Sequence, residues 1–217
     1  MRPIIATAGP LASASATNIR TASAIAGAGA VTLNGSLVSG GVATLDNPRR
    51  VLITSAGNDS GITFTLTGKN AAGDTLTETI AGTNGSSAYS VLDYKLLTAV
   101  SSSGASAGNV SIGTNGIGGS PWVMLDPWAL PAVAMQFTAS GTVNYTVQQT
   151  LDDPNDPTNA VAAASVTWVD SADSNVVGAT TTQQTNYAFA PRYVRVRINS
   201  GSGSVVGTIS QSGVVSL

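Results

Sequence analysis

The segment GITFTLTGKNAAGDTLTETIAG, residues 61–82, decides the fold class, because apolar residues and threonine alternate on both sides of a glycine-containing turn. Successive side chains of a strand point to opposite faces, so Ile62, Phe64 and Leu66 share one face. After the turn, Leu76 and Ile80 share a face in the same way. The segment predicts a β-hairpin with one apolar face and one threonine-covered, almost uncharged face.

The same pattern of strand, short turn and strand continues along the chain. GGVATLDNPRRVLITSAG, residues 40–57, predicts two strands joined by a turn at Asp46-Asn47-Pro48. Asn34-Gly35 predicts a hairpin turn in the same manner. Further strands are expected at 87–100, 109–113, 133–139, 142–150, 165–170, 186–190, 192–199 and 204–210. No segment favours a helix longer than a few turns, so the predicted fold is all-β, with one or two β-sandwich-like domains.

Glycine, proline and small residues indicate the domain boundaries. Residues 1–30 are rich in Ala, Ser and Thr, and prolines and glycines interrupt any long helix. We expect an extended N-terminal arm there, with a disordered tail as the alternative. The glycine-rich segment GTNGIGGSPW, residues 113–122, favours a boundary that separates a domain over 31–118 from a second over 119–217. Five spaced apolar residues are candidate anchors of the arm on a partner: Ile4, Ile5, Leu11, Ile19 and Ile25.

The composition excludes several kinds of chemistry. The chain has 217 residues, of which 9% are charged, against roughly 25% in a typical soluble protein. It contains neither cysteine nor histidine, which excludes disulfides, zinc–thiolate sites and imidazole acid–base catalysis. The net charge of −2 argues against binding to nucleic acid, and no segment is apolar enough for a membrane helix. We therefore expect no cofactor and no enzymatic activity.

Acidic residues are few, and a structural role is the simpler interpretation of each. The cluster DDPNDP, residues 152–157, could offer oxygen ligands to calcium, but Asp, Asn and Pro are also the common residues of turns, and we favour a turn. Glu78 is the only glutamate and falls on the apolar face of the predicted hairpin. We expect it to pair with Lys69 or Arg50, or to lie at the rim of the sheet.

Two groups of residues are candidates for partner binding at the surface. Trp122 and Trp128 flank an Asp-Pro turn and could seal an interface, but packing in the core of their own chain is the favoured interpretation. In the segment 193–198, Tyr193, Arg195 and Arg197 alternate with apolar residues. Such a stripe could bind an acidic partner or could keep an edge strand soluble, and these residues alone do not separate the two.

Three segments of the chain resemble structural proteins of tailed-phage virions. They are GGVATLDNPRRVLITSAGNDSGITFTLTGKNAAGDTLTETIAG, NVSIGTNGIGGSPW and GTVNYTVQQTLDDP, within about residues 31–155. The resemblance implies a component of the virion, made in the host cytoplasm, either a head decoration (cement) protein or a part of the neck or tail. It implies a homo-oligomer that contacts the major capsid protein or neck and tail proteins, and it brings no catalytic residue.

Two other functions remain as alternatives at this point. A tail or fibre module that binds a host glycan would use Trp122, Trp128 and Trp168 as stacking platforms. A glycan hydrolase is the weakest alternative, because paired carboxylates are scarce.

Overall fold

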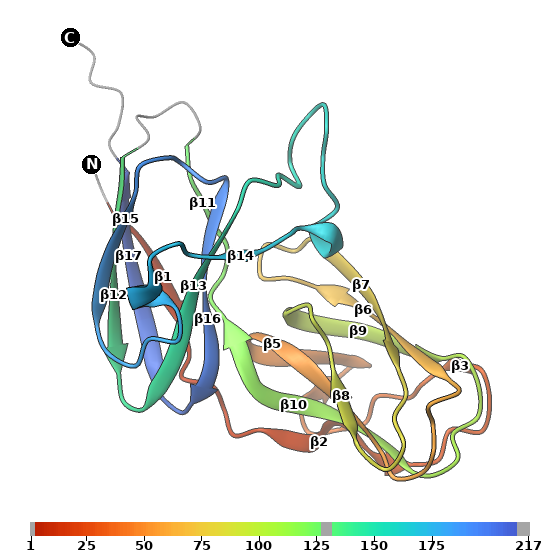
Figure 1. The fold of residues 1–217 in the computed structure, drawn as a ribbon. Coiled ribbons are helices and arrows are strands. Elements are labelled where there is room, and N and C mark those ends of the chain that lie inside the picture. Colours follow the sequence, from red (N-terminus) through yellow and green to blue (C-terminus); the bar gives the residue numbers. More distant parts are fainter. Residues whose placement is uncertain (1–2, 127–131, 212–217) are drawn as a thin grey trace. The chain divides into compact units, whose positions relative to one another are not determined.

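The computed structural model describes residues 3–126 and 132–211, and it confirms the all-β prediction, with 55% of the residues in strands and 3% helical. The chain forms two compact units (Figure 1). Unit 1 contains residues 1–11 and 117–217, and unit 2 contains residues 12–116. The observed division after residue 116 lies close to the predicted one after residue 118.

Unit 1 is a sandwich of two antiparallel sheets. The first sheet has the strand order β1-β17-β12-β15, and the second contains β14, β13, β16 and the end of β10, with β11 paired to β16. The elements are β1 (Ile4–Ala8), β11 (Val123–Met124), β12 (Val133–Ser140), β13 (Val143–Thr150), β14 (Val169–Asp170), β15 (Gln183–Tyr187), β16 (Tyr193–Gly201), β17 (Ser204–Gln211), and the 3-10 helices η1 (Ala163–Ser165) and η2 (Ser174–Val176).

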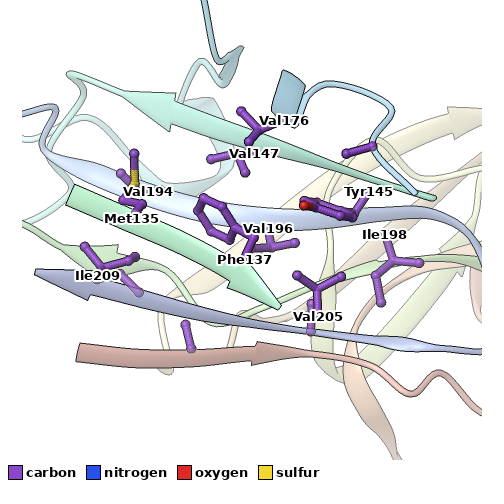
Figure 2. Close-up of a cluster of buried hydrophobic side chains, with 14 of the residues drawn as sticks. Met135, Phe137, Tyr145, Val147, Val176, Val194, Val196, Ile198, Val205 and Ile209 are labelled. Atoms are coloured by element: carbon purple, nitrogen blue, oxygen red, sulfur yellow. The ribbon is translucent and has the colours of Figure 1, made fainter. Parts of the chain in front are cut away.

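The core of unit 1 lies between these sheets, as Figure 2 shows. Phe137 from β12 and Tyr145 from β13 are fully buried, with ring centroids 6.3 Å apart. Val194, Val196 and Ile198 point into this core, which confirms the alternation expected for β16. Apolar residues at every second position therefore bind the two sheets together.

The sheet of unit 2 has the strand order β10-β5-β9-β6-β7. Four further strands pair with it, β2 with β10, β3 with β9, and both β4 and β8 with β5. Its elements are β2 (Ser15–Ser23), β3 (Gly29–Ala30), β4 (Val38–Ser39), β5 (Val42–Ser55), β6 (Thr63–Lys69), β7 (Thr75–Ala81), β8 (Ser87–Tyr89), β9 (Tyr94–Ser102) and most of β10 (Val110–Gly119). The predicted hairpin is β6 and β7, in which Phe64 pairs with Ile80 and Leu66 with Glu78. Phe64 and Leu66 are fully buried.

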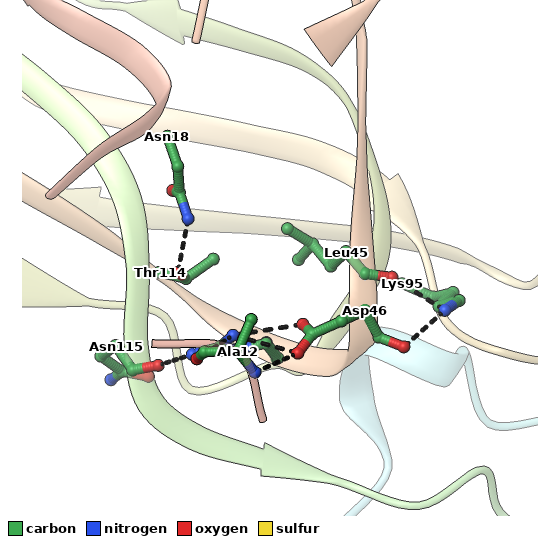
Figure 3. Close-up of polar contacts among 8 residues, drawn as sticks. Ala12, Asn18, Leu45, Asp46, Lys95, Thr114 and Asn115 are labelled. Atoms are coloured by element: carbon green, nitrogen blue, oxygen red, sulfur yellow. Dashed lines mark hydrogen bonds and ion pairs between the residues drawn. The ribbon is translucent and has the colours of Figure 1, made fainter. Parts of the chain in front are cut away.

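The predicted turn at Asp46-Asn47-Pro48 is wrong, because these residues lie inside the single strand β5. The pairing of β5 with β9 shifts between Thr44 and Arg49, which marks a bulge. Proline has no amide hydrogen for the ladder and is tolerated at bulges. The Lys95 ammonium donates to the carbonyls of Leu45 (2.8 Å) and Asp46 (3.0 Å), so side chains replace ladder bonds there (Figure 3).

The glycine-rich segment at the predicted boundary is not a loop, because most of it belongs to strand β10. Its first part pairs with β2, and Gly118 and Gly119 pair with β16. A β-carbon on Gly113 would lie 1.9 Å from the carbonyl oxygen of Ser15, so glycine is required there by the close approach of β2. In this segment glycine permits tight packing of strands rather than a flexible connection.

Residues 3–30 do not form a separate arm. β1 pairs with β17 from Ile4–Ile209 to Ala8–Val205, which makes the first strand part of unit 1. β2 and β3 pair with β10 and β9 in unit 2. The Asn34-Gly35 hairpin is also wrong, because both amides donate to the Ile19 carbonyl. The Ala-, Ser- and Thr-rich composition suits strands that pair at close distance, and it did not distinguish them from an arm.

Candidate functional site

The acidic residues singled out in the sequence have structural roles. Glu78 accepts hydrogen bonds from the amides of Val91 (2.6 Å) and Leu92 (3.0 Å), and not from Lys69 or Arg50 as expected. It therefore anchors the turn before β9. In the described parts of the chain, no three Asp or Glu residues cluster closely enough to hold a metal ion.

The carboxylates of residues 152–157 also serve as hydrogen-bond acceptors. Asp152 Oδ2 accepts from the Thr167 amide at 2.7 Å, and Asp153 pairs with Arg192 at 2.5 Å. Asp156 accepts from the amides of Thr158 and Asn159, and these hydrogen bonds hold its pKa below the ordinary value. These contacts are those of aspartates that organise a loop.

Three of the five predicted anchors of the arm are core residues of their own chain. Leu11 belongs to the core of unit 1, and Ile19 and Ile25 are buried within unit 2. They cannot contact a partner, because folding of this chain already covers them. Ile4 and Ile5 remain 46% and 67% exposed, so the structure retains only these two as candidates.

Ile4 and Ile5 lie on the edge strand of a sheet that carries no charge. The strands β1, β12, β15 and β17 contain no Asp, Glu, Lys or Arg. Four residues form a row across the outer face, one from each strand. Ile5 of β1 pairs with Thr208 of β17, Thr208 pairs with Gln136 of β12, and Gln136 pairs with Gln184 of β15. The Gln184 side-chain amide donates to Gln136 at 3.2 Å. We name this the uncharged face, defined by the outward residues Ile5, Gln136, Gln184 and Thr208.

A broad hollow of about 580 Å³ opens on the uncharged face, lined in part by Gln136, Gln184 and Thr208. Asp173 lies at its margin, and among the described lining residues it is the only charged one. The hydrogen bond from the Thr185 hydroxyl, followed by that from the Asn175 amide, lowers the pKa of Asp173. Apart from Ala134 and Met135, the other lining residues offer amides and hydroxyls, which bind partners by hydrogen bonding and not by charge.

The predicted stripe on β16 is covered by aromatic side chains and is not an open surface. Trp122 contacts Trp168 and Tyr193 edge to face, with centroids 5.0 and 5.9 Å apart. The Arg195 guanidinium lies 4.2 Å from the centre of the Trp168 ring and donates to Gln148. Tyr193 and Arg195 are consequently buried, and only Arg197 is half-exposed.

This aromatic cluster corrects the expectation for the tryptophans. Trp122 and Trp168 are half-buried and contact each other, so they are not open stacking platforms. Burial raises the pKa of Tyr193, whose hydroxyl also accepts from Asn155 and donates to Asp153. Trp128 lies outside the described residues.

Sequence reasoning missed a second exposed group in unit 1. Leu151, Val169 and Phe189 are large apolar residues that remain 75%, 56% and 45% exposed and line one pocket. Leu151 lies between the predicted strand 142–150 and the predicted turn 152–157, and the other two lie near the ends of the predicted strands 165–170 and 186–190. A large apolar residue at the end of a strand was the only feature of the sequence that could have indicated this exposed group.

Comparison with known proteins adds no relative. No protein-family model matches the chain, and no curated protein matches it significantly. Among the described residues, no helix is long and apolar enough to cross a membrane. The arrangement of the surface residues therefore has to carry the functional argument.

Proposed function

We propose that this chain is a non-enzymatic structural protein of a tailed-phage particle, a decoration protein that binds and stabilises the head. The observation that carries the proposal is the uncharged face with its exposed edge strand β1. The resemblance of residues 31–155 to virion proteins supports the same assignment. No catalytic role has emerged for the candidate carboxylates, which bind backbone amides and an arginine.

The edge strand provides the docking chemistry. β1 pairs on one side with β17, and the other side of the strand is the edge of the sheet in the described part of the chain. Proteins usually protect such edges with charges or bulges, because unpaired amides and carbonyls bind other strands. β1 has neither device. Ala6 and Ala8 are buried, but the exposed residues Ile4, Ile5 and Thr7 on this edge suit the addition of a strand from a neighbouring virion protein.

Particle binding tests this function directly. Purified chain is added to particles that lack it, and bound copies are counted by quantitative mass spectrometry against the major capsid protein. We expect copies in proportion to the capsid lattice. Ile5→Lys should reduce binding about tenfold, the effect of losing about 1.4 kcal/mol. The matched control is Val91→Lys, because Val91 in unit 2 is also 67% exposed.

Two outcomes contradict the proposal. Only a few bound copies per particle would assign the chain to the neck, tail or a fibre. Equal binding of the Ile5→Lys and Val91→Lys proteins would exclude the β1 edge as the docking surface.

A further inference from the structure

A surface pocket of about 300 Å³ lies at the end of β13 in unit 1. Gln149 of β13 pairs with Val169 of β14, and Leu151 follows where β13 ends. Phe189 and Pro191 line the pocket from the segment between β15 and β16. Its volume is at the lower end of the range of small-molecule sites, which fits a ligand of one or two rings.

Three of the residues that line the pocket are apolar and solvent-exposed. Leu151, Val169 and Phe189 are 75%, 56% and 45% exposed and line the same pocket. Exposed apolar residues that gather in one place mark binding sites, whereas isolated ones need no explanation. Phe189 contacts the ring of Tyr187 at 5.3 Å, which holds the aromatic group in position.

Polar groups also line the pocket, among them Gln149 and Asp152. Gln149 Oε1 is buried and has no hydrogen-bond partner among the described residues. An unpaired buried oxygen destabilises the fold, so a ligand that gives this amide a hydrogen-bond partner would gain binding energy. The last torsion of glutamine is soft, and its rotation can present the amide oxygen or nitrogen to the pocket. The Thr167 amide donates to Oδ2 of Asp152. Among the contacts of the described residues, Oδ1 of the same carboxylate can therefore accept a hydrogen bond from a ligand.

These groups define the class of ligand. A compound with hydroxyl donors on one side and C–H groups on the other would satisfy the amide and carboxylate while it covers Phe189. The negative face of an aromatic ring attracts the weakly positive hydrogens of such C–H groups. Asp152 is the only charged residue among the described residues that line the pocket, so an anionic ligand would be repelled. We propose that this pocket binds a neutral pyranose ring of a saccharide.

This site is distinct from the uncharged face and from the Trp122–Trp168 pair. The pocket shares no lining residue with the hollow on the uncharged face. Saccharide binding and particle binding are therefore separable by mutation. A saccharide site would let a virion protein contact glycans outside the particle while the β1 edge is docked.

The experiment uses the full chain and saturation-transfer NMR with glucose, galactose, mannose and N-acetylglucosamine, followed by titration of each sugar that responds. We expect millimolar binding of at least one of them. Phe189→Ala should weaken it about tenfold or more. Met124→Ala is the matched control, because Met124 is 51% exposed in the same unit and does not line the pocket. It should bind sugar as the unmodified chain does.

Gln149→Leu gives a second readout that a purely structural role would not produce. It removes the unpaired buried oxygen, so the free energy of unfolding should stay equal or rise, while sugar binding is lost. Absence of binding by all four sugars overturns the proposal, as does unchanged binding by Gln149→Leu. If no sugar binds and Phe189→Ala lowers particle binding, the pocket receives an apolar side chain of a protein partner instead.

Discussion

In unit 2, Nη1 of Arg49 lies 3.2 Å from Oδ1 of Asp46, three residues earlier in the same strand. Arg49 is only 1% exposed. The same guanidinium donates to the carbonyl of Ala12 at 2.9 Å and to that of Asn115. One buried cation thus joins the bulge of β5, the start of unit 2 and β10.

Replacement of this arginine should be strongly destabilising. Arg49→Ala removes the cation together with its hydrogen bonds to the carbonyls of Ala12 and Asn115. We expect the free energy of unfolding to fall by about 3–5 kcal/mol, as for other broken buried pairs. Urea unfolding followed by circular dichroism measures the change. Lys69→Ala removes one exposed charge and should change stability by less than about 0.5 kcal/mol; equal effects of both variants would refute the role given to Arg49.

The carboxylate of Asp46 should make the free energy of unfolding depend on pH in the acidic range. Burial acts to raise the pKa of Asp46, but the hydrogen bond from Ala12 and the charge of Arg49 outweigh it and lower the pKa. The stabilisation is therefore complete above the unfolded value of about 3.9 and is lost as pH falls through the lower folded value. In urea unfolding at pH 2–5, the free energy of unfolding of Asp46→Asn should change less with pH than that of the unmodified chain. An unchanged acid slope would contradict this assignment.

Tyr145 in unit 1 should make the free energy of unfolding depend on pH in the alkaline range. Burial raises the pKa of Tyr145 to about 12, and its hydroxyl donates to the Thr181 carbonyl at 3.0 Å. The folded protein holds this proton more tightly than the unfolded chain, whose tyrosine pKa is about 10. Stability should thus be unaffected below pH 10 and decline as pH rises from about 10 through about 12. Tyr145→Phe should reduce that decline; the remaining slope belongs to Tyr94, Tyr187 and Tyr193, whose pKa values burial also raises.

Two glycines of β10 provide a test with an internal control. A β-carbon at Gly113 would lie 1.9 Å from the Ser15 carbonyl, whereas one at Gly116 would meet no atom within 4 Å. Gly113→Ala should therefore push β2 away and destabilise unit 2 by about 1–3 kcal/mol. Gly116→Ala should be nearly neutral in the same thermal unfolding measurement. Similar results for the two would indicate that this segment is a loose linker after all.

Alternation was the part of the fold that the sequence predicted well. Phe64 and Leu66 on β6, and Val194 and Val196 on β16, are buried where the two-residue period placed them. Glycine and proline misled the prediction, because each has two physical uses. Gly113 permits close strand contact and Pro48 occupies a bulge, yet both residue types also mark turns.

Contacts between residues far apart in the sequence explain most of the wrong predictions of partner-binding residues. Leu11 and Ile19 looked like anchors for a partner because their covering residues are distant in sequence. Arg195 looked exposed because nothing in its own strand shows that Trp168 lies over it. Local patterns report which face a residue occupies, but they do not report what covers that face.

The pairing of β1 with β17 has a consequence for biosynthesis. Ile4 pairs with Ile209, so the first strand cannot find its neighbour until 205 further residues have been made (209 − 4). At about 5–20 residues per second, translation of that length takes roughly 10–40 seconds. Residues 12–116 can fold during this interval, while the emerged β1 has two unsatisfied sides and no charge to repel other nascent chains. Slow ribosomes and high temperature should thus trap this chain in aggregates before its last strand arrives.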